Sequence, residues 1–219
     1  GYSNSEIESD SVKIAGLVCR DFNHHNSRYG SDGDLDEYFK KEKIVCIYDI
    51  DTRALVRHIR DKGAMNAIIS SLNLDLQSLK KELSSVPSME GLELSSFVST
   101  QETYSLGDES SKYRVAVIDF GVKKSILKCL ESRDVYIKVF PMDVTLDHMS
   151  QFNPTGIFLS NGPGDPGVMN DIIEKVKKII NSSIPVFGIC LGHQLIALAG
   201  GLKTFKMHTG HRGINHPVI

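Results

Sequence analysis

The sequence predicts an α/β protein in two parts: a small N-terminal α/β unit and a larger domain built on a doubly wound parallel sheet. Strand-like and helix-like segments alternate four times within residues 112–219, which is typical of a parallel sheet with helices on both faces. A shorter set of such segments occupies residues 1–84. Between them, residues 85–111 are rich in Ser, Glu and Gly without a sustained apolar period, so we interpret them as a linker or an irregular surface arm.

In the N-terminal part, β-branched runs predict strands, and apolar residues at helical spacing predict helices. We expect strands over 12–19, 44–50 and 67–70, and helices over 35–43, 52–62 and 76–83. Asp51 or Thr52 can cap the second helix, and Gly63 is a natural stop after it. We find no candidate catalytic residue in this part.

In the C-terminal part the alternation is regular. We expect strands over 114–119, 135–140, 156–159 and 185–189, and helices over 122–131, 146–151, 168–180 and 191–199. Sites in such sheets lie at the carboxyl ends of the strands. The loops after Asp119, Leu159 and Ile189 are therefore the ones in which we expect chemistry.

Composition excludes several classes of protein. A net charge of -2 gives no basic surplus for nucleic acid or an anionic membrane, and no apolar run approaches the roughly 20 residues of a membrane helix. The acidic, polar N-terminus is unlike a signal peptide and lacks an initiator Met, so we expect a fragment. Four widely spaced cysteines without a C-x-x-C pair suggest reduced thiols in a cytoplasmic protein: Cys19, Cys46, Cys129 and Cys190.

The stretch PVFGICLGHQ, residues 185–194, is the most informative. A buried strand runs into G-x-C-x-G and then into an apolar helix, which is a nucleophile elbow with sulfur in place of a serine hydroxyl. The two glycines, Gly188 and Gly192, leave room for the tight turn. Cys190 would then lie at the helix N-terminus, where the dipole favours a thiolate, and the Leu191 amide could donate to an oxyanion. The alternative is a buried cysteine in a glycine-rich turn, which is how we interpret the other three cysteines.

The loop LSNGPGDPG, residues 159–167, contains the pattern G-x-G-x-x-G of dinucleotide sites. Pro163 and Pro166 remove amide donors that a phosphate would need, and Asp165 adds a negative charge, so a nucleotide site is the weaker interpretation. The loop can instead face the elbow, where a Gly162 amide could be a second oxyanion donor. It can also be a tight turn in which Pro166 begins a helix.

The histidines offer two further possibilities. His193 follows Cys190 by three positions, but we favour a packed, hydrogen-bonded side chain over a general base. His208, His211 and His216 suggest a metal cluster at first sight, yet no Cys or acidic partner accompanies them, so we do not expect zinc there.

Three motifs together resemble class I glutamine amidotransferases: residues 159–166, 185–194 and GHRGINHPV at 210–218. AGLVCRDF (15–22) and DIDTRALVRHIRDKGAMNAII (49–69) are similar to the extra domain of carbamoyl-phosphate synthetase small subunits. DFGVKKSIL (119–127), in the C-terminal part, resembles the same subunits. The resemblance runs nearly end to end. It implies a partial small-subunit domain over 1–84 and a partial amidotransferase domain over 112–219, with both ends of the chain truncated.

The resemblance also implies a reaction. Cys190 is expected to attack glutamine and release ammonia through a thioester, with Gly162, Gly164, Leu191 and Gln194 contacting the substrate. Ammonia would pass to a large synthetase subunit, which uses ATP to make carbamoyl phosphate for arginine and pyrimidine synthesis. The small subunit is expected to need no metal or cofactor of its own.

The expected general base and its orienting carboxylate form a His-x-Glu pair downstream of residue 219, so we expect these 219 residues alone to be inactive or weakly active. The alternatives are a glutaminase serving anthranilate or guanylate (GMP) synthesis and a non-catalytic assembly module. Residues 49–69 argue against the first alternative, because those glutaminases need no such N-terminal unit. An intact Cys190 argues against the second.

Overall fold

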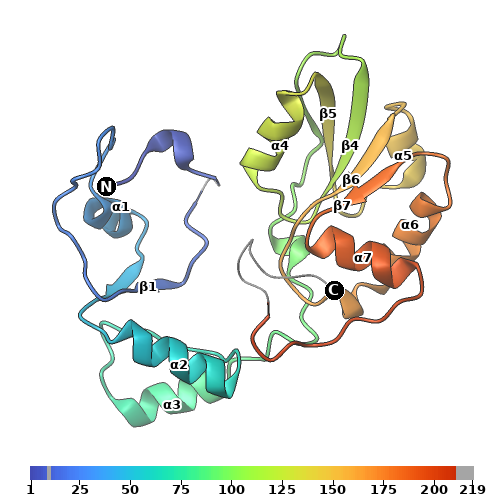
Figure 1. Ribbon diagram of the computed structural model, residues 1–219. Helices are drawn as coiled ribbons and strands as arrows, with labels where there is room; N and C mark the ends of the chain where they lie inside the picture. Colours follow the sequence, from blue (N-terminus) through green and yellow to red (C-terminus); the bar gives the residue numbers. More distant parts are fainter. Residues whose placement is uncertain (9–10, 211–219) are drawn as a thin grey trace. The chain divides into compact units, whose positions relative to one another are not determined.

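The computed structural model describes residues 1–8 and 11–210 (Figure 1). The chain folds into two compact units: Gly1–Ser88 with the described residues from Lys206 onward, and Met89–Phe205. The helices of the described residues are too short or too polar to cross a lipid bilayer.

The first unit joins short helices to a two-stranded parallel sheet. Its elements are η1 (Asn4–Glu6), β1 (Gly16–Val18), α1 (Leu35–Lys41), β2 (Val45–Ile47), α2 (Thr52–Lys62) and α3 (Leu76–Ser84). Each α-helix is preceded by an N-cap aspartate whose carboxylate accepts a hydrogen bond from a backbone amide of the first turn. These aspartates are Asp34, Asp51 and Asp75. Gly63 ends α2 with φ 89°, a conformation that favours glycine. The capping signals of the sequence thus set the helix boundaries.

Three expectations for this unit need correction. The strands expected over 12–19 and 44–50 are each only three residues long. The strand expected over 67–70 is wrong, because those described residues form no ladder. The side chain of Ile69 instead lies close to β1, since a Cβ added to Gly16 would be 2.9 Å from the Cδ1 atom of Ile69. Among the unit's described apolar residues only Phe39 is buried. Short strands therefore fit a unit with little apolar core.

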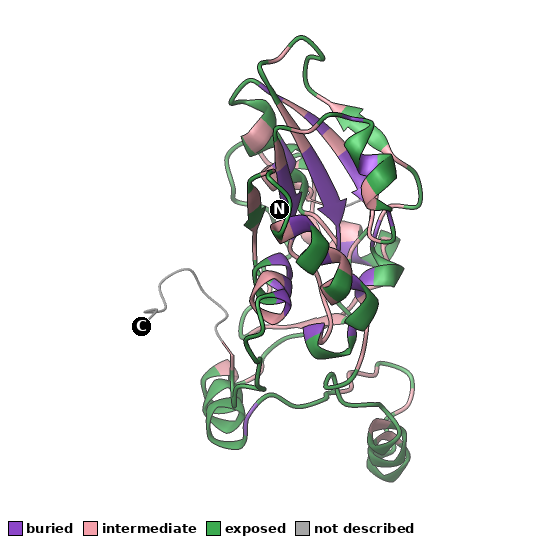
Figure 2. Ribbon diagram, turned by 90° about the vertical axis from the view of Figure 1, so that its right-hand side faces the viewer, coloured by how far each residue is buried: buried purple, intermediate pink, exposed green. Residues whose placement is uncertain are grey.

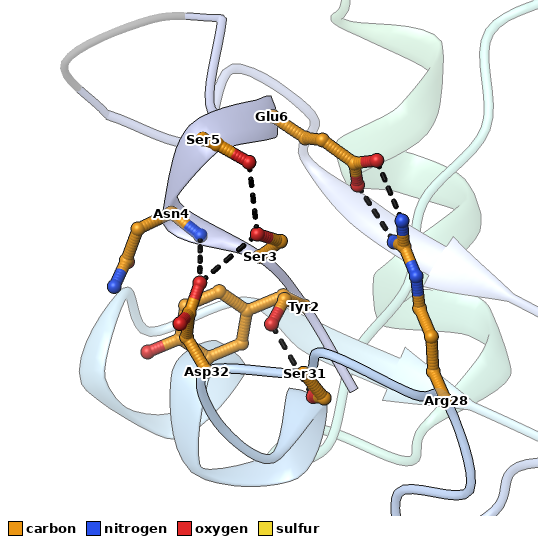
Figure 3. A network of polar contacts seen from close by, with 8 residues as sticks. All are labelled: Tyr2, Ser3, Asn4, Ser5, Glu6, Arg28, Ser31 and Asp32. Carbon is orange, nitrogen blue, oxygen red and sulfur yellow. Dashed lines mark hydrogen bonds and ion pairs between the residues drawn. The ribbon is translucent and has the colours of Figure 1, made fainter.

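The N-terminal segment is held by polar contacts (Figure 3). The Asp32 carboxylate accepts the Asn4 amide at 2.7 Å and the Ser3 hydroxyl at 2.9 Å. The Arg28 guanidinium donates to both oxygens of Glu6 at 2.6 Å. The Asn4 amide, followed by Ser3, lowers the pKa of Asp32, and hydrogen bonding to Arg28 lowers the pKa of Glu6. Both carboxylates thus favour the charged form in the folded unit.

These shifts predict an acid-sensitive segment. Because both folded pKa values are lowered, the stabilisation is present above the ordinary carboxyl pKa values, about 3.9 for Asp and 4.3 for Glu. It is lost as the pH falls through the lowered folded values. In a carboxyl ¹³C NMR titration we expect Asp32 and Glu6 to titrate below those ordinary values. As a control, Arg28→Gln should return Glu6 to its usual range without moving Asp32, and ordinary titration of both in the unmodified chain would contradict the prediction.

The second unit contains four successive strand–helix pairs, as expected. Its elements are η2 (Ser95–Phe97), β3 (Tyr104–Leu106), β4 (Tyr113–Asp119), α4 (Lys124–Glu131), β5 (Val135–Pro141), α5 (Leu146–Ser150), β6 (Gly156–Leu159), η3 (Pro166–Val168), α6 (Asn170–Ile180), β7 (Val186–Gly188) and α7 (Leu191–Ala199). The strand order is β3-β5-β4-β6-β7, and every pair is parallel except β3 with β5. The predicted α/β class with a mostly parallel sheet is confirmed.

Alternate residues of β4 serve two apolar clusters, one on each face of the sheet. Ala116 and Ile118 belong to the cluster that includes residues of α5, α6 and α7. Val117 belongs to the other, which contains Leu127 of α4. Figure 1 shows α4 and α7 on opposite sides of the strands, and Figure 2 shows the buried residues concentrated in the sheet. Helices on both faces make the sheet doubly wound.

The order in which successive strands join the sheet reverses at β4, although the strands on both sides of it are parallel to it. β5, the next strand along the chain, lies on one side of β4, and β6 lies on the other side. In open α/β sheets, ligands bind at such a switch point, outside the carboxyl ends of the strands.

Part of the segment that we interpreted as a linker lies in this unit. β3, within 85–111, pairs with β5 from Tyr104↔Val139 to Leu106↔Ile137. The Asp119 carboxylate, 4% exposed at the end of β4, accepts the Thr100 amide at 2.7 Å. The domain boundaries drawn at 84 and 111 stay predictions, but much of this stretch packs on the sheet.

Candidate active site

The loops after β4, β6 and β7 meet at the carboxyl end of the sheet. Ser160, which is fully buried, connects all three: its hydroxyl accepts the Phe120 amide at 2.8 Å, and its carbonyl accepts the Gly192 amide at 3.1 Å. The Asn161 side chain donates to the Gly121 carbonyl at 2.9 Å. The three loops that the sequence singled out are therefore adjacent.

Cys190 occupies a strained turn between β7 and α7. Its φ of 53° and ψ of -108° are rare for a residue with a side chain, and it is the N-cap residue of α7. The residue is exposed. A sharp strand-to-helix turn that presents an accessible side chain is the geometry of a nucleophile elbow.

The glycines on either side of Cys190 are required by close backbone approach. A Cβ on Gly188 would lie 2.6 Å from the Gly192 carbonyl carbon, and one on Gly192 would overlap the Leu159 carbonyl oxygen. The Ile189 amide also donates to that oxygen at 3.1 Å. β6, β7 and α7 thus touch through backbone atoms, as the sequence predicted.

The first turn of α7 leaves an amide for a ligand. The Gly192 amide is committed to Ser160 and Ile189, and the Gln194 amide donates to the Cys190 carbonyl at 3.0 Å. Within the described part of the chain, the Leu191 amide has no acceptor. An N–H at the first helical position, next to the cysteine, is suited to an anionic oxygen.

The glycine loop lies beside the elbow. A Cβ on Gly162 would overlap the Phe120 carbonyl oxygen and lie 2.9 Å from Cδ2 of Leu191. Gly164 has φ 103°, where side chains are strained. Pro166 begins η3, and the Asp165 carboxylate accepts the Gly167 amide at 2.9 Å. The loop therefore brings Gly162 against Leu191 and also forms the expected proline turn.

Other expectations from the sequence fare differently. Gln194 and His193 are both exposed on α7, so a packed His193 is wrong. Cys129 is also exposed, contrary to the core role expected for it, whereas Cys19 and Cys46 are half-buried. Turns of a helix that face solvent account for both errors, since periodicity alone does not say which face is covered.

Part of the histidine cluster, His211 and His216, lies outside the described residues, as does all but the first residue of the motif at 210–218. The His208 ring nitrogen Nε2 lies 3.1 Å from the Arg60 carbonyl oxygen. No group of three His, Cys, Asp or Glu side chains suited to a metal ion occurs among the residues with described positions.

Sequence reasoning missed three contributors: Asp119, Ser160 and the segment 91–99. The Asp119 carboxylate accepts the Gly121 and Val122 amides at 2.8 and 2.7 Å. An aspartate at the end of a buried strand, before a glycine, could have indicated such a loop anchor. Ser160 and 91–99 act through tertiary contacts, for which the local sequence gives no signal.

The exposures predict an order of alkylation by iodoacetamide. We expect Cys190 to react first, because it is exposed and lies at the N-terminus of α7. Burial, followed by the neighbouring Cys19, raises the pKa of the Cys46 thiol, so Cys46 should react last and accelerate only at alkaline pH. Peptide mass spectrometry after timed quenching measures the order. Cys129 is the exposed control, and its reaction before Cys190 would contradict the prediction.

Comparison with known proteins gives two family matches. The family described as "Glutamine amidotransferase class-I" matches residues 116–219, and "Carbamoyl-phosphate synthase small chain, CPSase domain" matches residues 1–69. The two ranges fall in the two predicted parts of the chain.

Curated relatives match over the whole chain. The carbamoyl phosphate synthase small chain of Chlorobaculum tepidum is 41% identical over 100% of this chain and 60% of its own length. The small chain of Thermotoga maritima is 42% identical over 100% of this chain and 55% of its own. The small chain of Vibrio vulnificus is 40% identical over 100% of this chain and 62% of its own length. This sequence spans about three-fifths of the relatives' length. Over its whole length it is similar to carbamoyl phosphate synthase small chains, and its residues 116–219 match the class I glutamine amidotransferase family.

Proposed function

We propose that this chain is the glutamine-hydrolysing part of a carbamoyl phosphate synthase, with Cys190 as the nucleophile. The observation that carries the proposal is the strained, exposed Cys190 at the N-terminus of α7, beside an amide of Leu191 that has no acceptor among the described residues. The match of residues 116–219 to the class I glutamine amidotransferase family supports the same reaction.

The proposed reaction has two stages. The Cys190 thiolate attacks the carboxamide carbon of glutamine, and the carbonyl oxygen becomes an oxyanion that accepts backbone N–H groups. The C–N bond then breaks, the nitrogen takes a proton and leaves as ammonia, and a glutamyl thioester remains. Water attacks the thioester, which releases glutamate and restores the thiol.

Substrate contacts are assigned to the residues around the elbow. Leu191 would donate its amide to the oxygen of the reacting carboxamide, with the Gly162 amide expected from the sequence and the Gly164 amide as further donors. Gln194 would contact the substrate from α7. No metal or nucleotide has a role in this half-reaction.

The proposal extends to a partner and a location. Ammonia would pass to a large synthetase subunit that uses ATP and bicarbonate to make carbamoyl phosphate for arginine and pyrimidine synthesis. A cytoplasmic location is proposed from the widely spaced cysteines.

The thioester provides a direct test. Isotope-labelled glutamine is mixed with the protein, the reaction is quenched in acid, and peptides are analysed by mass spectrometry. We expect a labelled glutamyl group on the peptide that contains Cys190 and none on the peptide of Cys129, the other exposed cysteine. Label on neither peptide, with ammonia still released, would refute the assignment of the nucleophile.

Partner binding should be separable from chemistry. Pull-down of the large subunit by Cys190→Ser protein is expected to match that by the unmodified protein, because the substitution leaves the backbone intact. Retained binding with retained glutaminase activity would contradict the proposed role of Cys190, and binding without glutaminase activity in the unmodified protein would favour an assembly module.

A further inference from the structure

A short segment that precedes the sheet, residues 91–95, lies against the glycine loop. Glu93 and Gly164 form an antiparallel bridge, and the Asp165 amide donates to the Leu92 carbonyl at 2.8 Å. Because the hydrogen bond joins the neighbouring residues Asp165 and Leu92, Glu93 and Gly164 form a non-hydrogen-bonded pair of this antiparallel bridge. In antiparallel pairing such residues direct their N–H groups away from the partner strand, so the Gly164 amide points away from 91–95.

The side chain of Ser95, in this segment, fixes the orientation of the peptide group between Pro163 and Gly164. Ser95 is fully buried, and its hydroxyl donates to the Pro163 carbonyl at 2.9 Å. The described peptide bonds are all trans, so the Pro163 carbonyl and the Gly164 N–H point in opposite directions. Holding the carbonyl therefore sets the direction of the amide, which has no acceptor within residues 1–8 and 11–210.

This peptide needs an anchor because of the residue that follows it. Gly164 has φ 103°, and a Cβ there would lie 2.9 Å from both the Leu92 carbonyl oxygen and the Leu94 amide nitrogen. Glycine is thus required for the segment to lie so close. Glycine also permits rotation of the preceding peptide at little cost, so an external hydrogen bond is needed to hold one orientation.

We infer that Ser95 is a positioning residue of the glutaminase site: its hydroxyl holds the Pro163–Gly164 peptide so that the Gly164 N–H faces the reacting carboxamide of glutamine. The inference rests on the proposed function. Ser95 acts through Gly164 and does not itself touch substrate.

Two electrophiles separate this role from a general structural one. Iodoacetamide reports the accessibility and ionisation of Cys190. The glutamine analogue 6-diazo-5-oxonorleucine carries a ketone oxygen where glutamine has its carboxamide oxygen, so its reaction depends on the amide donors as well. In Ser95→Ala protein we expect labelling by the analogue to slow about tenfold, less than the loss of a direct oxyanion donor, with the iodoacetamide rate unchanged. In the complete enzyme, kcat for glutamine should fall with KM little changed.

Ser96→Ala is the matched control, because Ser96 is exposed in the same turn and its hydroxyl donates to the Glu93 carboxylate. It should leave both labelling rates unchanged. Equal slowing of both reagents in Ser95→Ala, or no slowing of the analogue, would overturn the positioning role. If the analogue fails to label Cys190 in the unmodified protein, the proposed function itself fails, whichever variant is tested.

Discussion

Cys190→Ser is expected to lower glutamine hydrolysis by about four orders of magnitude or more, the scale of loss when a catalytic nucleophile is removed. The serine hydroxyl fits the elbow, since it replaces one sulfur by a smaller oxygen, but it does not ionise near neutral pH as a thiol can. The measurement is glutamate release from labelled glutamine by the complete enzyme, with substrate above KM.

The control for this substitution is Cys129→Ser. Cys129 is the other exposed cysteine and lies on α4, so loss of a solvent-facing thiol is matched without a change at the elbow. We expect its turnover to remain within a factor of two of the unmodified enzyme. Turnover by Cys190→Ser above a hundredth of normal would mean that another group attacks the substrate.

The second large effect is expected from Gly192→Ala. The new methyl group would overlap the carbonyl oxygen of Leu159, and its nearest neighbours also include the Leu159 carbonyl carbon at 2.6 Å. These are backbone atoms of a buried strand, so they cannot rotate away as a side chain could. Overpacking costs typically 1–3 kcal/mol and sometimes more, and we expect a loss of about 3 kcal/mol in the free energy of unfolding together with loss of labelling at Cys190.

Gly200→Ala supplies a matched control at the other end of α7. A Cβ at Gly200 would come no closer than 3.4 Å to the Ala197 and Ile196 carbonyl oxygens, an ordinary contact. Urea denaturation followed by circular dichroism measures both variants. If Gly192→Ala unfolds at the same urea concentration as Gly200→Ala, the close approach of α7 to β6 is not as tight as described.

The sheet domain was predictable because its signals are local. β6 and α7 have the predicted bounds, Gly156–Leu159 and Leu191–Ala199, since an apolar run ends at a loop in each case. The elbow was equally predictable, because the two glycines of G-x-C-x-G mark the positions where side chains cannot fit. Fold class and the location of the site follow from such patterns.

The contributions of tertiary contacts could not be predicted. Nothing near Ser95 or Asp119 in the sequence says that one meets Pro163 and the other Thr100, at separations of 68 and 19 residues. The strand expected over 67–70 failed for a related reason: Ile69 has strand-forming character, but a strand exists only where a neighbour offers a ladder. Periodicity also left open which side of α7 faces solvent, so the exposure of His193 was not foreseen.

The bridge between Glu93 and Gly164 changes how variation in residues 85–111 should be viewed. A true tether tolerates gain or loss of a residue, because only its reach matters. Here a one-residue shift in register that put Leu94 in the place of Ser95 would remove the hydroxyl that faces Pro163 and turn alternate groups to the wrong side. Natural or engineered changes in length are therefore expected to be tolerated between β3 and β4, around residues 107–112, and selected against between 91 and 99.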